Sequence, residues 1–192
     1  MRICVYGAAS PTIDPTFVEI TEKLGREMAK RGHSLVFGGG ANGLMGAVAR
    51  GVRDEKGEIL GVIPNFFFDD YVEAICDFCT ELVRCETMRE RKKIMEDNAD
   101  AFIVAPGGIG TFEEFFEILT SKQLCRHNKP IVLFNLKDYY KELSTMMEAS
   151  VEKNFVKENC LELYKVTGEI DEIFEYLEGP HEIRTVRELK DG

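Results

Sequence analysis

Residues 101–114 read AFIVAPGGIGTFEE and carry the clearest structural signal in the chain. The first five are apolar and favour a buried β-strand, and the residues from Gly110 onward have the spacing of a helix. The glycines between them allow backbone N–H groups to approach an anion closely, and a helix N-terminus attracts negative charge. The stretch therefore predicts a phosphate cradle between a strand and a helix. A tight turn without a ligand is the alternative that the pattern leaves open.

The same alternation of strand and helix runs along the whole chain. Short apolar runs, several ending at Gly or Pro, predict strands at 2–7, 34–37, 58–63, 80–84, 101–105 and 131–134. Helical spacing predicts helices at 15–28, 43–55, 87–98, 110–125, 137–150 and 169–177. Such an order favours right-handed crossovers. We predict an α/β, doubly wound Rossmann-like fold with a mostly parallel sheet and helices on both faces, which binds ligands beyond the carboxyl ends of its strands.

The length of the chain fits one domain. With 192 residues, 44% of them hydrophobic, the chain can bury a substantial core, so residues 1–180 are predicted to form a single Rossmann-like nucleotide-binding domain. Residues 181–192 are expected to form a polar tail, and residues 64–79 a loop or lid over the site. No apolar run approaches the roughly 18 residues of a membrane span, and the first residues resemble a strand, so we expect no membrane contact and a cytoplasmic location.

Cysteine usage and net charge restrict the chemistry. Six cysteines, in a chain too large to need disulfides, predict reduced thiols. Cys76 and Cys79 have the spacing of half a zinc site, but no second pair or histidine partner follows, so no metal is predicted. The net charge of −10 disfavours nucleic acid, which is bound by Lys and Arg that neutralise its phosphates. A small anionic ligand needs only a local positive pocket.

Two further turns of small residues follow predicted strands. Residues 38–46 (GGGANGLMG) formally satisfy the G-x-G-x-x-G pattern of dinucleotide sites. They follow the second strand, however, and no clear acidic ribose ligand appears about 20 residues on, so they are weak evidence for NAD. Residues 6–10 (YGAAS) end the first strand. Three such turns at one sheet edge favour a nucleotide ligand. Gly7, Ser10, Gly39 and Gly40 are therefore candidate phosphate-binding residues.

The segment 87–95 (TMRERKKIM) begins a predicted helix with basic residues. Met88, Arg91 and Lys92 are spaced so that they lie on one face of this helix. A solvated basic face and a ligand site are equally compatible with this pattern.

Glu114 has two interpretations. Its carboxylate lies three residues after Thr111, which is the spacing of a capping box that would stabilise the helix N-terminus. The same carboxylate would also lie beside the predicted phosphate cradle. The spacing alone does not distinguish a cap from a functional carboxylate.

Taken together, three motifs resemble the LOG ("Lonely guy") family of phosphoribohydrolases, long described as lysine decarboxylases. The family patterns Gly-Gly-Gly-x-x-Gly-Leu-Met-Gly, Met-x-x-Arg-Lys and Pro-Gly-Gly-x-Gly-Thr-x-x-Glu match residues 38–46, 88–92 and 106–114 in the same order. The likeness extends from residue 3 to about residue 135, and more loosely to residue 177. Ser121 and Cys125 stand where members usually carry Trp and Gly. These departures bear on the base pocket and dimer face more than on the phosphate site.

The resemblance implies a hydrolase that cleaves the N-glycosidic bond of a nucleoside 5′-monophosphate, either AMP or a cytokinin riboside 5′-monophosphate. The products are the free base and ribose 5-phosphate. Such enzymes need no cofactor and are typically homodimers. Carried over position by position, the catalytic pair falls on Arg91 and Glu114. The substrate-binding positions fall on Gly40, Met88, Lys92, Gly107, Gly108, Ile109, Gly110 and Thr111.

Three other functions compete with this hypothesis. A non-catalytic nucleotide carrier, similar to molybdenum-cofactor carrier proteins, would share the fold. A pyridoxal-phosphate decarboxylase would need a lysine in a setting that the sequence does not show. An NAD-dependent enzyme would use the turn at 38–43.

Overall fold

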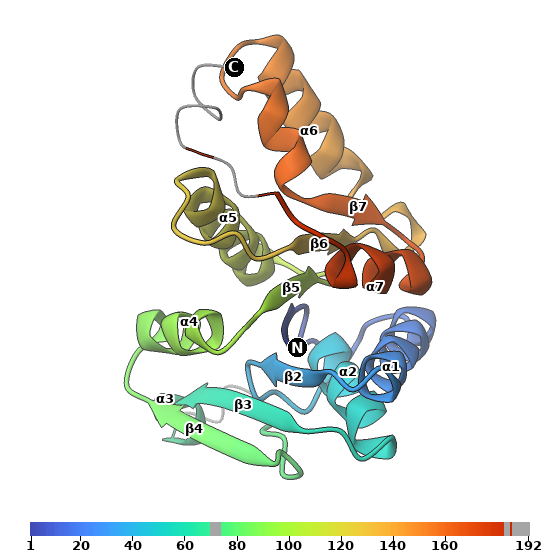
Figure 1. Cartoon of the computed structure of the whole chain (residues 1–192). Helices are drawn as coiled ribbons and strands as arrows, with labels where there is room; N and C mark the ends of the chain where they lie inside the picture. Colours follow the sequence, from blue (N-terminus) through green and yellow to red (C-terminus); the bar gives the residue numbers. More distant parts are fainter. Residues whose placement is uncertain (70–73, 183–184, 186–192) are drawn as a thin grey trace.

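One sheet organises the chain, whose computed structural model describes residues 1–69, 74–182 and 185. Its strands are β1 (Arg2–Tyr6), β2 (Ser34–Phe37), β3 (Ile59–Pro64), β4 (Glu81–Cys85), β5 (Ala101–Val104), β6 (Ile131–Phe134) and β7 (Lys165–Thr167). They lie in the order β4-β3-β2-β1-β5-β6-β7, and every pair is parallel (Figure 1). The predicted doubly wound α/β fold is confirmed.

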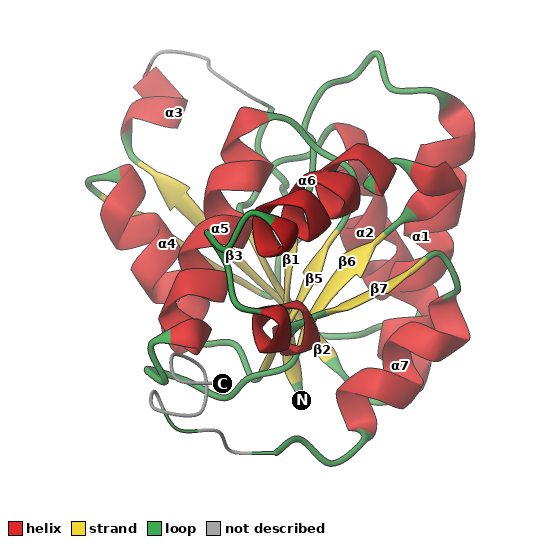
Figure 2. Cartoon of the chain, turned by 90° about the horizontal axis from the view of Figure 1, so that it is seen from above, coloured by secondary structure: helices red, strands yellow, loops and turns green. Residues whose placement is uncertain are grey.

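Helices cover both faces of the sheet, as Figure 2 shows. One face is covered by α1 (Pro15–Lys30), α2 (Gly43–Asp54) and α7 (Ile170–Glu178). The other face is covered by α4 (Met88–Asp97), α5 (Ile109–Gln123) and α6 (Lys141–Glu152). Short helical turns complete the described chain, namely α3 (Phe66–Asp69), η1 (Leu136–Asp138) and η2 (Glu158–Leu163).

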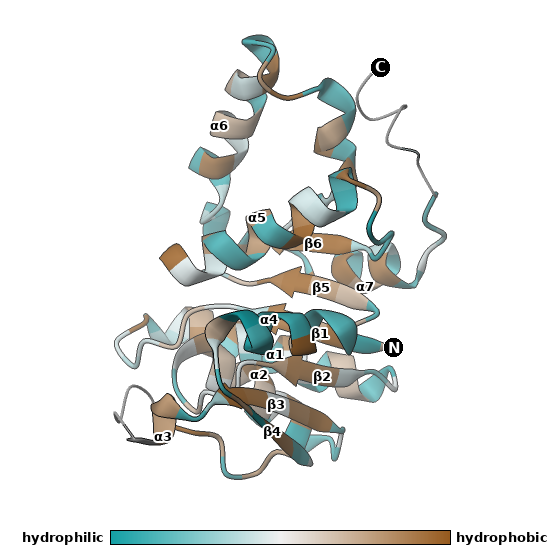
Figure 3. Cartoon of the chain, turned by 90° about the vertical axis from the view of Figure 1, so that its left-hand side faces the viewer, coloured by the Kyte–Doolittle hydropathy of each residue, from teal (hydrophilic) through white to brown (hydrophobic). Residues whose placement is uncertain are grey.

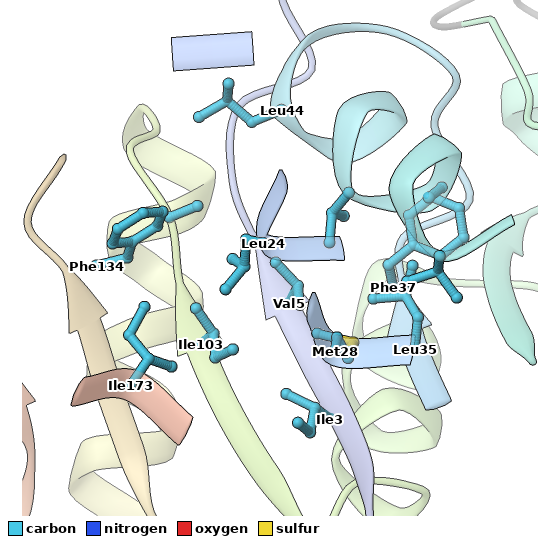
Figure 4. Packing of buried hydrophobic residues seen from close by; sticks show 14 of the residues in the cluster. Ile3, Val5, Leu24, Met28, Leu35, Phe37, Leu44, Ile103, Phe134 and Ile173 are labelled. Carbon is cyan, nitrogen blue, oxygen red and sulfur yellow. The ribbon is translucent and has the colours of Figure 1, made fainter. Parts of the chain in front are cut away.

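The central strands β5 and β6 are apolar along their whole length because both of their faces are buried. In the α1 side of the core, Ile3 and Val5 of β1 pack with Leu24 and Met28 of α1, all of them at most 1% exposed (Figure 4). Burying one such side chain contributes roughly 1.5–3 kcal/mol. Figure 3, which is coloured by hydropathy, shows that β3 and β6 are mainly hydrophobic and that α4 is mainly hydrophilic. The sheet is therefore a rigid base for the turns at its edge.

Local sequence signals set the start of α1. The Asp14 carboxylate accepts a hydrogen bond from the Thr16 N–H at 2.8 Å, and Pro15 occupies the first turn. Asp14 is therefore the N-cap of α1, and Pro15 is its first helical residue.

The structure corrects several predicted boundaries. β7 was not predicted, and α3 lies within the segment predicted to be a loop. The helix expected at 137–150 begins only at Lys141, because Lys137 and Asp138 adopt positive φ angles of 52° and 60°. Of the predicted tail, residues 183, 184 and 186–192 lie outside the described residues, as do residues 70–73 of the predicted lid. The domain boundary at residue 180 stays a prediction. Within the described ranges, no helix is long and apolar enough to cross a membrane.

Candidate active site

The ends of β1 and β5 mark the point where the chain changes direction across the sheet. From β1 the chain moves outward through β2, β3 and β4, and then returns to β5 on the other side of β1. Ligands of doubly wound folds bind in the crevice beyond the strand ends at such a switch point. The turns after β1 and β5 meet here, because the Ala8 N–H donates to the Pro106 carbonyl at 3.0 Å.

The turn after β5 leaves the N-terminus of α5 open. Gly108, at the N-cap, makes no side-chain capping bond, and Gly108, Ile109 and Gly110 are all exposed. A Cβ atom at Gly108 or Gly110 would meet no atom within 4 Å among the described residues, and neither glycine adopts a positive φ. Packing among the described residues therefore does not require glycine at these two positions.

Two tyrosines and a threonine hold this open turn in place. The Tyr139 hydroxyl donates to the Gly107 carbonyl at 2.5 Å, and the Tyr140 hydroxyl donates to the Ala105 carbonyl at 2.7 Å. The buried Thr111 side chain packs so closely over Gly107 that a Cβ there would overlap it. The sequence analysis missed both tyrosines. Their position shortly after a predicted strand, and so at the same sheet edge, is the signal that could have identified them.

The turn after β2 is closed by contacts within the chain. The Ala8 carbonyl accepts a hydrogen bond from the Leu44 N–H at 2.8 Å, at the N-terminus of α2. A Cβ at Gly43 would lie 2.5 Å from the Ala8 carbonyl oxygen, and one at Gly46 would overlap the Ala41 carbonyl. Packing requires glycine at both positions.

Gly39 and Gly40 are buried within the same turn. The Gly39 carbonyl accepts from the Cys76 N–H at 2.8 Å, and the Ala41 N–H donates to the Ala74 carbonyl at 2.7 Å. These bonds attach the segment after residue 74 to the turn. A contact of Gly39 and Gly40 with substrate stays a prediction.

Gly7 and Ser10 border the switch point in the turn after β1. A Cβ at Gly7 would lie 3.3 Å from the Ala105 Cβ, which is closer than an ordinary contact. Ser10 is exposed, and its hydroxyl lies 3.0 Å from the Thr12 hydroxyl. Both residues lie beyond the end of β1, as expected, and their binding of phosphate stays a prediction.

Arg91 is buried beneath the turn after β2 and is only 9% exposed. Its Nε donates to the Val62 carbonyl at 3.1 Å and its Nη2 donates to the Gly38 carbonyl at 2.7 Å. Its Nη1 lies 3.9 Å from the Sδ of Met88, a residue that is 39% exposed. The ends of β2 and β3 thus fix the guanidinium in one orientation. The interpretation of this residue as part of a solvated basic face is therefore wrong.

Lys92 is also buried, at 8% exposure, and links α4 to α5. Its ammonium forms ion pairs with the exposed carboxylates of Glu113 and Glu117. Burial alone would lower the pKa of Lys92, but the hydrogen bonds that its ammonium donates to the two carboxylates raise it overall. Lys92 therefore carries a positive charge at neutral pH. The sequence analysis missed both acidic partners, which lie four residues apart on one face of α5.

Glu114 is a partly buried carboxyl group in the second turn of α5. Burial, partly opposed by the nearby positive charge of Arg91, raises its pKa to about 7. Arg91 and Glu114 form no direct hydrogen bond in the part of the chain described by the structure, so Arg91 acts on Glu114 through space. A carboxyl group that titrates near neutrality is suited to exchange protons with a substrate or with water.

An apolar hollow of about 260 Å³ adjoins the open turn. It is lined in part by Ala8, Ile13 and Phe17 on one side and by Gly107 and Tyr139 on the other. The site therefore combines an open helix N-terminus, a carboxyl group with a raised pKa and an apolar recess.

Comparison with known proteins decides the family. A family model described as "Possible lysine decarboxylase" matches residues 45–177. The chain is 40% identical to the cytokinin riboside 5′-monophosphate phosphoribohydrolase of Rhodococcoides fascians, over 80% of this chain and 77% of the relative. It is 38% identical to the enzyme of the same name from Mycobacterium tuberculosis, over 88% of each chain. The chain belongs to the LOG family.

Solved structures support the fold alone. The molybdenum cofactor binding protein of Rippkaea orientalis superimposes with a TM-score of 0.71, and the match covers 92% of this chain and 94% of that protein. The two sequences are 20% identical, so this likeness does not extend to function.

Of the two departures from the LOG pattern, Cys125 has a clear conformational consequence. It follows α5 with a φ of 53°, in the left-handed region that favours the glycine usually found there in LOG proteins. Its N–H donates to the Lys122 carbonyl at 2.9 Å. Ser121 lies within α5, where its carbonyl accepts from the Arg126 N–H at 2.9 Å. The end of α5 therefore holds a cysteine in a backbone conformation that favours glycine.

Proposed function

We propose that this protein hydrolyses the N-glycosidic bond of a nucleoside 5′-monophosphate, AMP or a cytokinin riboside 5′-monophosphate. The observation that carries the proposal is the raised pKa of Glu114. This carboxyl group lies beside the open N-terminus of α5, and its pKa is about 7. The curated relatives are named for this reaction and are 33–40% identical to the chain over the aligned residues. Membership of the LOG family and the geometry of the site thus support the same reaction.

Glu114 is the catalytic carboxylate in this proposal. As the bond between C1′ of the ribose and the base nitrogen breaks, its electron pair leaves with the base, and positive charge develops on the sugar. The ionised Glu114 stabilises this charge and takes a proton from the attacking water. The oxygen of that water forms the new bond to C1′, and protonation of the base completes its release.

Arg91 fixes the electrostatics around Glu114. Because two carbonyl groups hold its guanidinium, its positive charge lies at one place and favours the ionised form of Glu114. Burial has the opposite and larger effect, so Arg91 keeps the pKa near 7 rather than higher. This balance leaves the carboxylate available at neutral pH.

The open turn after β5 binds the 5′-phosphate in this proposal. The N–H groups of Ile109, Gly110 and Thr111 and the dipole of α5 favour an anion there. Binding energy from the phosphate, which is remote from the reacting bond, positions C1′ against Glu114. Nucleosides that lack the phosphate are therefore expected to react much more slowly than their 5′-monophosphates.

Lys92 argues against a decarboxylase. A lysine that forms a Schiff base must be neutral when it attacks, which requires a lowered pKa. The carboxylates of Glu113 and Glu117 raise the pKa of Lys92 instead. This lysine therefore acts as a fixed positive charge at the site.

We further propose that the protein is a homodimer in the cytoplasm. The LOG resemblance implies a dimer, and Ile109, beside the phosphate turn, is apolar and 88% exposed. Sedimentation analysis should give about twice the 21.8 kDa mass of one chain. A monomer at micromolar concentration would contradict the dimer.

The proposed activity is tested by measuring free base and ribose 5-phosphate released from AMP and from its N6-isopentenyl analogue. Glu114→Gln keeps the size of the side chain but removes its charge, and we expect kcat to fall by about 10³-fold. Arg91→Ala should also abolish most turnover. Glu175→Gln, an exposed position on α7, is the matched control and should retain full activity.

The outcomes separate an enzyme from a carrier. Turnover that disappears in Glu114→Gln while AMP still binds would support catalysis by Glu114. Tight binding of both nucleotides by the native chain without any release of base would favour the carrier hypothesis. The ratio of the two turnover rates would define the base preference.

A further inference from the structure

Three consecutive phenylalanines begin the short helix α3, which follows β3, and the proposed hydrolysis gives them no role (Figure 1). The ring of Phe67 lies under the guanidinium of Arg91, whose central carbon is 5.4 Å from the ring centroid. Phe68 lies instead under the guanidinium of Arg84, at 4.0 Å. One of the three rings therefore adjoins the arginine of the candidate active site, and its neighbour does not.

The position of Phe67 is fixed by contacts with β4 and with the adjacent ring. The Asn65 N–H donates to the Cys85 carbonyl at 2.8 Å, and the side-chain amide of Asn65 donates to the Glu86 carboxylate at 2.7 Å. Phe66 packs edge to face against Phe67, with ring centroids 5.0 Å apart and ring planes at 71°. The start of α3 is thus attached to the end of β4, and the Phe67 ring is supported from the side.

The contact with Phe67 adds a third element to the environment of Arg91. The carbonyl groups of Val62 and Gly38 accept hydrogen bonds from two of its nitrogens, at 3.1 and 2.7 Å. The face of an aromatic ring carries partial negative charge and attracts a cation, most strongly where water is excluded. Arg91 is 9% exposed and Phe67 is 7% exposed, so little water reaches this contact.

We propose that Phe67 is a positioning residue for Arg91, because the face of its ring keeps the guanidinium buried and in the one place from which it acts on Glu114. This inference rests on the proposed function, in which Arg91 keeps Glu114 available as a carboxylate. The side chain of Phe67 acts through Arg91 and takes no part in the chemical step.

The proposal has an electrostatic consequence for Glu114. Burial is the largest effect on this carboxyl group and raises its pKa to about 7. The charges of Arg91 and Lys92 on α4 favour its ionised form, whereas those of Glu113 and Glu117 on α5 oppose it. Without the ring, the guanidinium would move and become hydrated, so its effect would weaken and the pKa of Glu114 would rise further.

The experiment compares Phe67→Leu, which keeps an apolar side chain but removes the ring, with the matched control Phe68→Leu. Nuclear magnetic resonance of the full-length proteins measures hydrogen exchange of the Arg91 Nε–H and titration of the Glu114 carboxyl carbon. In Phe67→Leu, we expect this exchange to be about tenfold faster and the pKa of Glu114 to be higher. Phe68→Leu should keep both native values, because its ring adjoins Arg84.

Two further replacements separate the charge of the ring face from packing. Phe67→Tyr keeps the ring and should restore the native exchange rate and titration. Replacement of Phe67 by pentafluorophenylalanine nearly keeps the shape of the ring but reverses the charge of its face, so this protein should behave like Phe67→Leu.

Catalysis supplies a second readout. In Phe67→Leu, kcat/KM for AMP should fall about threefold at pH 7 and approach the native value at pH 9, where Glu114 is ionised in both proteins. A fall of equal size at both pH values would overturn the positioning role and indicate a structural one.

The resonance measurements decide the proposal even if the protein hydrolyses no nucleotide, because neither depends on turnover. Native exchange of the Arg91 Nε–H and native titration of Glu114 in Phe67→Leu would overturn it. Equal changes in Phe68→Leu, or native behaviour of the pentafluorophenylalanine protein, would overturn it as well. Lack of turnover by the native chain would instead contradict the proposed hydrolysis.

Discussion

The turns after β2 and after β5 have similar sequences but different surroundings. Each is rich in glycine, follows a buried strand and begins a helix. In the turn at 38–46, the Ala8 carbonyl occupies the N-terminus of α2, and added Cβ atoms would collide with backbone. In the turn at 106–111, no side chain of the described residues caps the N-terminus of α5, and Cβ atoms added at Gly108 and Gly110 would meet none of their atoms. The first uses glycine to pack the chain, and the second leaves its backbone exposed.

This difference shows that a glycine motif does not reveal its purpose by composition alone. The question that separates the two cases is what a Cβ atom would meet. Where it would meet the protein, the glycine serves the fold, and where it would meet nothing, a ligand is the better explanation. Substitutions in the two turns can test this distinction.

The largest effect on stability is expected for Gly46→Ala. The added Cβ would overlap the Ala41 carbonyl, so α2 must shift, which should cost about 3 kcal/mol or more of the free energy of unfolding. Chemical denaturation of native and variant protein measures this cost. Unchanged stability would show that the turn after β2 is not closed by packing.

The next effect concerns Glu114 in the second turn of α5. Its pKa is raised from 4.5 to about 7, so the folded state holds the proton more tightly than the unfolded state. The protonated Glu114 therefore stabilises the folded state, and this contribution to the free energy of unfolding is present below pH 4.5 and is lost as the pH rises through 7. At pH 8, Glu114→Gln should therefore be more stable than the native protein by roughly 1–3 kcal/mol.

The same titration predicts the pH dependence of catalysis. Because the ionised carboxylate is the active form, kcat/KM for AMP should fall about tenfold per pH unit below 7. Denaturation curves at pH 4.5 and pH 8 and a pH–rate profile measure the two effects. A profile flat from pH 5 to 8, or equal stabilities of native and Glu114→Gln protein at pH 8, would contradict the assignment.

Gly110→Ala is the counterpart of Gly46→Ala in the open turn. The added Cβ meets no atom of the described residues within 4 Å, so the free energy of unfolding should change by less than about 1 kcal/mol. The Cβ would instead enter the space of the phosphate, and the Kd for AMP, measured by calorimetry with inactive Glu114→Gln protein, should rise about tenfold. Unaltered affinity would remove the argument that a ligand requires this glycine.

The smallest effect is expected for Tyr139→Phe. This change removes the hydroxyl that donates to the Gly107 carbonyl, a bond whose loss costs about 1 kcal/mol. A looser turn should raise KM for AMP about fivefold and leave kcat nearly unchanged. Steady-state kinetics measures both constants, with Tyr176→Phe on α7 as the control. A fall in kcat alone would assign Tyr139 to the chemical step.

Local sequence patterns predicted most of the fold. Short apolar runs marked six strands, and those near the centre of the sheet, such as β5 and β6, have no polar side because both of their faces are buried. The last strand, β7, escaped notice because it contains only Lys165, Val166 and Thr167, and its place at the sheet edge comes from pairing with β6. Positive φ angles at Lys137 and Asp138 likewise depend on contacts beyond the local pattern.

The candidate site was only partly accessible from sequence. The resemblance to the LOG family assigned Arg91, Lys92 and Glu114 to one site, whereas their spacing alone left their roles open. The tyrosines that hold the open turn and the acidic partners of Lys92 lacked any motif. Their contacts join segments 21 or more residues apart, from Lys92–Glu113 to Tyr140–Ala105.

The sequence by itself determined the alternation of strands and helices, the positions of the glycine turns and the family, because these depend on local periodicity and on ordered motifs. Only the tertiary structure decided which turn is closed and which is open, and that Glu114 titrates near neutrality. Both properties depend on which atoms surround a group. Those atoms come from distant parts of the chain and become neighbours only when the sheet forms.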